Sequence, residues 1–327
     1  MTQRRWVAFV VAALLLAGCG DRAVRGGPAI ESTVPAAACP PASPLRIDAR
    51  VRVGRGAGPM TVAGDRLWTS RPAAGVLVSV GLRATPRAAR PVRIGGAPVS
   101  LAAGLGSIYV ADRDRDRILR LDPVTGKVVR LAAIQSPVKV AVSQAALFAI
   151  SLDDGALHRL DPLTGVGTPL AIPALAPIDA VLEGGDLWIL GGGDGGVSPF
   201  DERRNAFVRA GVRMPTRVVG AIAAGAGAVW AALPTARAVA RIEPQTLSLG
   251  VLRASRGFAP TAVAVDGCSV WLGDSDGRVE RIDPATGRTL GRPVRSGTAL
   301  AALVADRGGV WASDPSDGTV VRVMPAG

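Results

Sequence analysis

The sequence predicts an all-β protein, a seven-bladed β-propeller with four antiparallel strands in each blade. An aromatic residue recurs seven times at intervals of 39 to 42 positions. Between these landmarks lie short apolar bursts, separated by turn residues, that are typical of buried strands. The seven aromatic positions are Trp68, Tyr109, Phe148, Trp188, Trp230, Trp271 and Trp311.

Residues 1–18 have the pattern of an export signal. Arg4 and Arg5 precede an apolar segment, residues 6–17, that is too short to span a bilayer. The segment ends in "LAGC", which resembles the lipobox of bacterial lipoproteins and implies lipidation of Cys19 as the N-terminus of the mature chain. An ordinary signal peptide that contains a cysteine is the alternative, and either the Sec or the twin-arginine route is open. We therefore expect a lipid anchor on the extracytoplasmic face of the cell membrane.

Residues 19–44 are rich in Ala, Pro and Gly and show no apolar period. Such a composition predicts a flexible tether between the lipid and a propeller domain over residues 45–327. The stretch "LRIDARVRV", residues 45–53, has the pattern of a strand but precedes the four strands of the first repeat. The seventh repeat, by contrast, stops after its third strand. We expect the N-terminal strand to complete the last blade and close the ring, which leaves no long exposed edge.

Two further features repeat with the aromatic residue. Tight turns of the form "DPxTG" occur at 122–126, 161–165 and 283–287, where Pro presets φ and Gly tolerates positive φ. An arginine recurs ten or eleven positions after the aromatic, and we expect these side chains to pair with carboxylates or turn carbonyls. The recurring arginines are Arg120, Arg159, Arg241, Arg281 and Arg322.

The stretches "VADRDRDRILRLDPVTGKVV" and "VWLGDSDGRVERIDPATGRT" resemble the repeats of the NHL, YVTN and virginiamycin B lyase-like propeller families. This resemblance implies the propeller fold. It implies little about activity, because those families include enzymes, sensor domains and proteins with no known chemistry.

The charge pattern indicates the kind of partner. The formal net charge is +12, and it comes almost entirely from arginine, since Lys127 and Lys139 are the only lysines. No arginine cluster alternates with aromatic residues as in single-strand nucleic-acid binders, and export also argues against a nucleic-acid partner. Anionic lipid headgroups or envelope polymers suit a basic surface better.

Residues for catalysis are sparse in this sequence. The single histidine, His158, stands at a strand position that other repeats fill with Leu119 or Ser198, so we interpret it as a tolerated surface substitution. Lys139 and Asp179 are the only charged residues in the entry halves of the channel-lining strands, and a single such pair is more often structural. We therefore predict no catalytic set, no metal site and no cofactor. A metal-dependent lyase or lactonase-type enzyme with its site at the channel mouth is the alternative.

Two cysteines besides Cys19 remain for an oxidising compartment. Cys268 lies between the first and second strands of the sixth repeat, and Cys39 precedes the strand assigned to the neighbouring seventh blade. We expect a Cys39–Cys268 disulfide beside the closure.

The alternating aspartates of "DRDRDR", Asp112 to Arg117, belong to a loop between the second and third strands that all repeats share. An EF-hand is excluded because Arg117 stands where glycine is needed and Pro123 where the bidentate glutamate belongs. We expect these loops to form a binding surface, and the function to be that of a monomeric, non-catalytic binding, scaffold or sensor module with a protein or envelope-polymer partner. The candidate surface residues are Arg71, Asp112, Arg113, Asp114, Arg115, Asp116, Asp154, Asp194, Arg237, Asp276 and Asp317.

Overall fold

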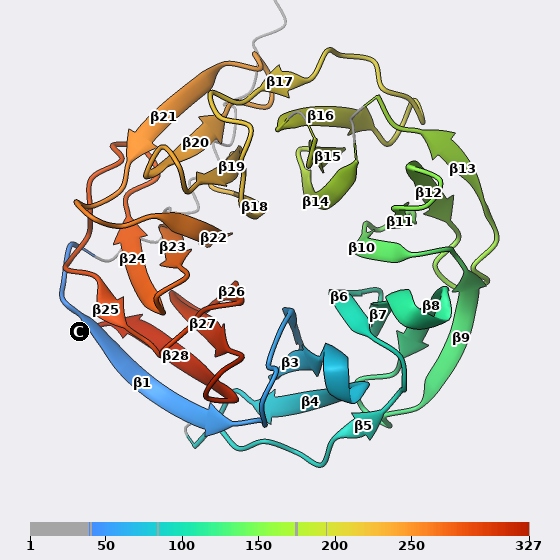
Figure 1. The fold of residues 1–327 in the computed structure, drawn as a ribbon, viewed down its shortest axis with the longest axis horizontal. Coiled ribbons are helices and arrows are strands. Elements are labelled where there is room, and N and C mark those ends of the chain that lie inside the picture. Colours follow the sequence, from blue (N-terminus) through green and yellow to red (C-terminus); the bar gives the residue numbers. More distant parts are fainter. Residues whose placement is uncertain (1–38, 40, 84, 174–175, 194, 327) are drawn as a thin grey trace, which may run out of the picture. The chain divides into compact units, whose positions relative to one another are not determined.

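The computed structural model describes residue 39 and residues 41–83, 85–173, 176–193 and 195–326. Within the compact unit Cys39–Gly327, the described strands form seven four-stranded antiparallel sheets. Figure 1 shows these sheets arranged radially around a central axis, with the first strand of each blade innermost. The predicted seven-bladed propeller is confirmed. The predicted signal peptide, Cys19 and most of the tether lie outside the described residues.

The strands follow the chain outward through each blade, except in blade 7, where the outermost strand is β1 (Leu45–Arg52). Blades 1 to 3 consist of β2 (Met60–Ala63), β3 (Arg66–Arg71), β4 (Val76–Gly81) and β5 (Val92–Arg93); β6 (Pro98–Gly104), β7 (Ser107–Asp112), β8 (Arg117–Leu121) and β9 (Val128–Ala133); and β10 (Pro137–Val142), β11 (Leu147–Ser151), β12 (Ala156–Leu160) and β13 (Gly167–Ala171). Blades 4 and 5 consist of β14 (Pro177–Glu183), β15 (Asp186–Gly191), β16 (Gly196–Asp201) and β17 (Val212–Arg213); and β18 (Ile222–Gly225), β19 (Ala228–Leu233), β20 (Ala238–Ile242) and β21 (Leu249–Arg253). Blades 6 and 7 consist of β22 (Pro260–Val265), β23 (Val270–Asp274), β24 (Arg278–Ile282) and β25 (Val294–Arg295); and β26 (Ala302–Asp306), β27 (Gly309–Asp314), β28 (Thr319–Pro325) and β1.

Ring closure depends on the pairing of β1 with β28. The two strands are antiparallel from Leu45 opposite Pro325 to Arg52 opposite Thr319. Val51 and Val53 are buried in a cluster that also contains residues of blades 7 and 1. The predicted closing strand is therefore confirmed, and it contributes to the core as well as to the hydrogen bonds of the last sheet.

The core lies between the blades. Each of the seven buried apolar clusters in the described unit is shared by two adjacent sheets, which pack face to face. Trp230 of blade 5, for example, packs with Val263 and Leu272 of blade 6. The recurrent aromatic of each blade thus fills the space between two sheets, which explains why the repeat needs one large apolar side chain per unit.

The recurrent arginines lie directly across the second and third strands from the aromatics. Arg241 faces Trp230, and its guanidinium carbon lies 5.8 Å from the centre of the ring while Nη1 lies 2.9 Å from the Glu243 carboxylate. Arg322 likewise faces Trp311, with its guanidinium carbon 6.0 Å from the ring centre. The expected carboxylate pairing is present at Arg241, and the cation–π contact is a second role that the prediction missed.

The "DPxTG" turns fold around their aspartates. In the first, Asp122 Oδ1 accepts hydrogen bonds from the backbone N–H groups of Val124 and Thr125, and Gly126 has a φ of 74°. Asp161 and Asp283 accept the same pair of bonds in their turns. The predicted turns are confirmed, and the aspartate is their organising group.

The segment ahead of β1 is attached to blade 6. A disulfide joins Cys39 to Cys268, with 5.2 Å between the two Cα atoms. Arg281 Nη1 donates a hydrogen bond of 3.3 Å to the carbonyl of Pro41. These contacts hold the chain to the blade next to the closure before β1 begins.

The turn aspartates make the stability of the folded protein depend on pH. Hydrogen bonds from the backbone N–H of the turn threonine and from that of the residue before it hold the pKa of Asp122, Asp161 and Asp283 below the ordinary value of 3.8. A carboxylate with a lowered pKa stabilises the folded state above the ordinary value and loses that effect as the pH falls through the lowered one. We predict that the triple Asp→Asn variant has a lower urea midpoint than the wild type at pH 7 and that the difference closes below pH 3.8.

The control is the same charge change at exposed aspartates outside these turns, Asp65, Asp114 and Asp276. Its midpoint should follow that of the wild type across the titration. If the urea midpoint of the turn variant stayed below that of the wild type by the same amount at every pH, the stabilising role given to the ionised turn aspartates would be contradicted.

Candidate functional site

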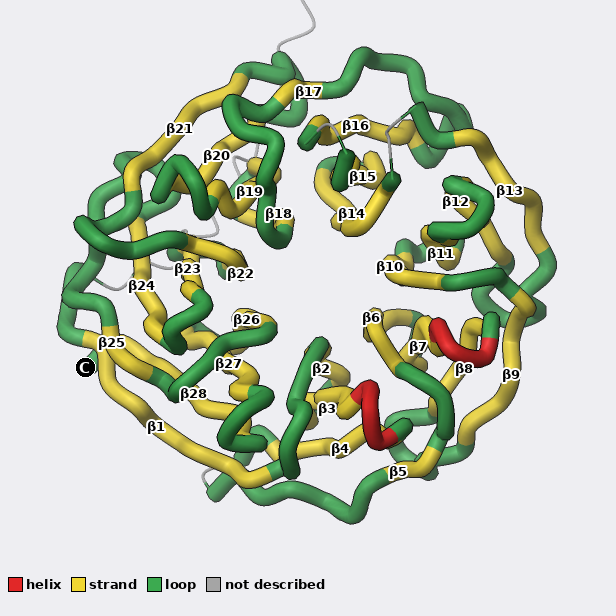
Figure 2. Tube along the Cα trace, viewed as in Figure 1, coloured by secondary structure: helices red, strands yellow, loops and turns green. Residues whose placement is uncertain are grey.

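One face of the propeller, the loop face, is formed by the loops between second and third strands together with the connections between blades. Backbone hydrogen bonds join the two sets: Ile94 N donates to Gly75 O, Ile134 N to Asp116 O, and Ser296 N to Gly277 O. The loops of blades 1 and 2 contain the 3-10 turns η1 (Pro72–Ala74) and η2 (Arg113–Arg115), red in Figure 2. The predicted surface residues that the structure describes belong to these loops or to the strand ends next to them.

Asp112 was predicted to belong to the binding surface, and this prediction is wrong. Its side chain is 0% exposed, with Oδ1 accepting from Ala97 N at 2.8 Å and Oδ2 from Arg117 Nε at 2.7 Å. Asp274 and Asp314 occupy the same position, three residues after the aromatic, and are also buried. A buried carboxylate here is bonded to its own loop and, in blades 2 and 7, to the neighbouring connection. An aspartate three residues after the aromatic recurs in three repeats of the sequence. That recurrence is the signal that could have predicted a structural role for Asp112.

Asp314 shows how fully such a carboxylate is satisfied. Burial alone would raise its pKa, but backbone N–H groups of Asp317, Thr298, Ala299 and Ser316 outweigh that effect and lower it. The group therefore stays ionised and serves the loop structure.

His158 also differs from its predicted role. Its side chain is only 13% exposed, and Nε2 lies 2.9 Å from Oδ2 of Asp154. Asp154 in turn accepts from the Ala156 N–H, and its pKa, which burial would raise, is lowered by Ser151, Ala156 and His158 together. His158 is thus a mostly buried residue that anchors the blade 3 loop, and one of the predicted surface aspartates is its partner.

The other predicted residues divide between structural and accessible ones. Asp116 accepts from Ser136 N at 2.8 Å and so links blades 2 and 3, while Arg71 Nε donates to Arg55 O. Asp194 lies outside the described residues. The remaining predicted residues have exposed side chains on the loop face: Arg113, Asp114, Arg115, Arg237, Asp276 and Asp317.

Four arginines lie in neighbouring loops and connections of the loop face over blades 5 and 6, and we call them the arginine band: Arg237, Arg256, Arg278 and Arg295. Arg237 O accepts from Ala254 N, which places this loop beside the connection that contains Arg256. Arg278 Nη2 donates to Gly257 O at 2.7 Å, and Arg295 Nη1 donates to Asp276 O at 2.7 Å. Only Arg237 of this group was predicted from the sequence. Arg256 lies in a connection between blades, Arg278 begins β24 and Arg295 lies in β25, so none of the three belongs to a loop between second and third strands.

Two acidic residues lie within the band. Asp274 is buried and its Oδ2 lies 2.5 Å from Arg278 Nη2, whereas Asp276 is exposed. Arg237 and Arg256 are exposed, with no carboxylate partner in the part of the chain that the structure describes. The band therefore presents positive charge to solvent, and an anionic partner fits it.

The channel gives no comparable site. It encloses about 240 Å³ and is lined mainly by apolar residues of the first strands. Lys139 Nζ lies 2.6 Å from Asp179 Oδ1, and Asp179 also accepts from the backbone N–H groups of Ala180 and Ile222. These contacts join blades 3, 4 and 5. Among the described residues, no group of three or more His, Cys, Asp or Glu side chains could share a metal ion.

Comparison with known proteins supports the fold. No family model and no curated protein sequence matches this chain. Virginiamycin B lyase from Staphylococcus aureus superposes with a TM-score of 0.74 at 12% identity, over 86% of this chain and 100% of that chain. A streptogramin B lyase structure gives 0.72 at 14% identity, over 86% and 97% of the two chains. The Swd1 β-propeller domain of Myceliophteria thermophila gives 0.71 at 14% identity, over 86% and 100%. At this identity the likeness shows a shared seven-bladed propeller.

No helix in the described part of the chain is long and apolar enough to cross a membrane.

Two aspartates of one loop provide a matched test of the loop structure. Asp112→Ala leaves the Arg117 guanidinium and the Ala97 N–H without their carboxylate, so we predict a loss of about 3 kcal/mol in the free energy of unfolding. Asp114 is exposed and lies 3.8 Å from Arg113, so Asp114→Ala should change it by less than about 0.5 kcal/mol. Urea denaturation measures both, and equal effects would show that Asp112 is not a structural group.

Proposed function

We propose that this protein is an exported, lipid-anchored β-propeller that acts as a non-catalytic binding or scaffold module at the cell envelope. The arginine band carries the proposal, because it places accessible positive charge on one face of a rigid scaffold. Its partner is an acidic protein or an anionic envelope polymer. Buried Asp274 holds the blade 6 loop, and backbone hydrogen bonds from Ala254 to Arg237 and from Ser296 to Gly277 join both loops to the neighbouring connections. Binding therefore costs little ordering of the backbone.

The N-terminal sequence supports export and anchoring. Arg4 and Arg5, the apolar segment 6–17 and the "LAGC" box form a consistent lipoprotein signal. The Cys39–Cys268 disulfide is in keeping with an oxidising compartment. A lipid on Cys19 would hold the propeller near the membrane through the segment 20–38, whose composition suits a tether.

Lipidation is tested by metabolic labelling with an alkyne analogue of palmitate. We predict that the wild-type chain is labelled and that Cys19→Ala is not, since Cys19 is the acceptor. Cys39→Ala is the matched control and should be labelled like the wild type. Label on Cys19→Ala, or none on the wild type, would overturn the anchoring part of the proposal.

Binding by the arginine band is tested with immobilised poly-L-glutamate as the anionic probe and dextran as the neutral one. We predict that Arg237→Glu/Arg256→Glu/Arg295→Glu lowers the affinity of the purified full chain for poly-L-glutamate by about tenfold or more, and that wild-type affinity falls with salt. The control Arg83→Glu/Arg87→Glu/Arg288→Glu makes the same charge change on the opposite face. Equal losses in the two variants would mean that net charge, and not the band, governs binding.

A further inference from the structure

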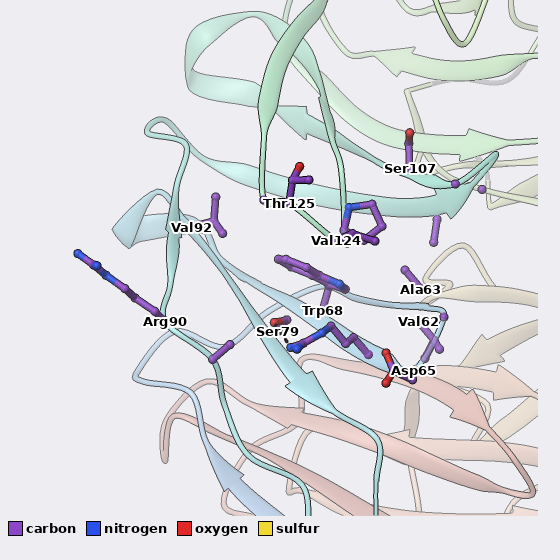
Figure 3. A pocket seen from close by; sticks show the side chains of 18 residues that line it. Val62, Ala63, Asp65, Trp68, Ser79, Arg90, Val92, Ser107, Val124 and Thr125 are labelled. Atoms are coloured by element: carbon purple, nitrogen blue, oxygen red, sulfur yellow. Dashed lines mark hydrogen bonds between the residues drawn. The ribbon is translucent and has the colours of Figure 1, made fainter.

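A groove lies between blades 1 and 2 on the face opposite the loop face. Its volume is about 760 Å³, and it is bounded by the β2–β3 turn, the β6–β7 turn and the "DPxTG" turn after β8. Figure 3 shows Trp68 at its centre, with Val62, Ala63 and Asp65 on one side, Val92 on the other, and Val124 and Thr125 across from them.

The groove coincides with a break in the repeat. In blades 5 to 7 the residue across from the tryptophan is an arginine, and its guanidinium carbon lies 5.8 to 6.0 Å from the ring centre. In blade 4 that position is Pro199, and Arg209 from the following connection covers Trp188 at 5.7 Å. In blade 1 the residue opposite Trp68 is Ser79. Within the described residues no arginine stands over this ring, so the place that a guanidinium fills in the other tryptophan blades is left to the groove.

Trp68 also has an unsatisfied polar group. Its side chain is 3% exposed, and Nε1 has no hydrogen-bond partner in the described structure. The indole groups of Trp188, Trp230 and Trp271 each donate to the residue five positions earlier. Trp311 is also unpaired, but Asp306 Oδ2, at the same spacing, is an equally unpaired acceptor. Trp68 has Ala63 at that spacing, and its N–H bonds neither to the Ala63 carbonyl nor to any other described acceptor. The donor is therefore unmet, and an acceptor from outside the chain could satisfy it.

The charges around the groove favour an anion. Arg66 Nη1 donates to Ser79 Oγ at 3.0 Å and has no carboxylate partner among the described residues. Arg90 stands at the rim, while Asp65, the one acidic lining residue, lies 3.5 Å from Arg83. Ser107 and Thr125 add hydroxyl groups, and Val62, Val92 and Val124 supply apolar walls. A pocket with a few polar groups among apolar walls is typical of small-ligand sites.

We propose that this groove binds a small organic anion, namely a carboxylate attached to an apolar ring. The carboxylate lies against the Arg66 guanidinium and supplies the acceptor that the Trp68 indole N–H lacks, while the ring contacts the valine walls. The site is separate from the arginine band, and its occupancy does not depend on the function proposed for the loop face.

The test uses 4-(trifluoromethyl)benzoate and its neutral counterpart 4-(trifluoromethyl)benzamide, with the full chain in phospholipid nanodiscs and empty nanodiscs as the blank. Fluorine NMR titration should show saturable one-to-one binding of the benzoate and about tenfold or weaker binding of the benzamide. The Trp68 indole cross-peak, identified by its loss in Trp68→Phe, should shift only with the benzoate. Wild-type protein that binds neither compound saturably, or both equally, overturns the proposal.

Variants locate the site. Ser79→Arg restores the arginine that stands at this position in five other blades, so it is compatible with the fold and should weaken benzoate binding by about tenfold or more. Ser79→Ala leaves the space open and should bind within about threefold of the wild type. Arg66→Gln should weaken binding, whereas Arg87→Gln, outside the lining, should not. Unchanged binding by Ser79→Arg, with folding verified by circular dichroism, would place the ligand elsewhere and sink the proposal.

Discussion

The hydrogen bonding of β1 to β28 is the constraint on which the rest of this propeller depends. Every buried aromatic lies between two sheets, so each blade requires a neighbour on both sides. Without β1, blade 7 would have an exposed edge, and the cluster that holds Val51, Val53 and Trp311 would lose its outer members. A strand from the start of the chain thus completes the sheet made at its end, and the ring closes with a contact between residues more than two hundred positions apart.

Much of the fold followed from the sequence because the information is periodic. The spacing of the aromatics, the "DPxTG" turns and the missing last strand each reflect a contact that all blades repeat, so the average over seven copies reveals the architecture. The behaviour of single residues was harder to predict. The sequence "DRDRDR" predicts a surface charge at Asp112, yet its carboxylate is buried, where it pairs with the Arg117 guanidinium and accepts a hydrogen bond from the Ala97 N–H. His158 reads as a tolerated substitution, yet its partner Asp154 belongs to the loop that precedes its strand.

The two candidate sites arise from opposite departures from the repeat. On the loop face, arginines that the repeat does not contain lie in or beside the loops and connections of blades 5 and 6, and the charges of Arg237 and Arg256 are available to solvent. On the other face, the repeat loses an arginine at Ser79, and space appears beside an aromatic that is elsewhere covered. Neither departure is visible to a search for known motifs. Both can be identified once the strand register shows which positions are equivalent in the seven blades. The absence of an arginine at Ser79 is noticed only by comparison with the blades that have one.

The Cys39–Cys268 disulfide has a mechanical consequence for an anchored protein. It lies before β1 in the chain and attaches that segment to blade 6, which β1 does not belong to. Tension applied to the chain ahead of Cys39 would therefore pass through a covalent bond into blade 6. The hydrogen bonds between β1 and β28 would be spared the shear that would otherwise peel the closing strand from the ring. If the chain is anchored as proposed above, a pull on the lipid would act on the propeller as one body.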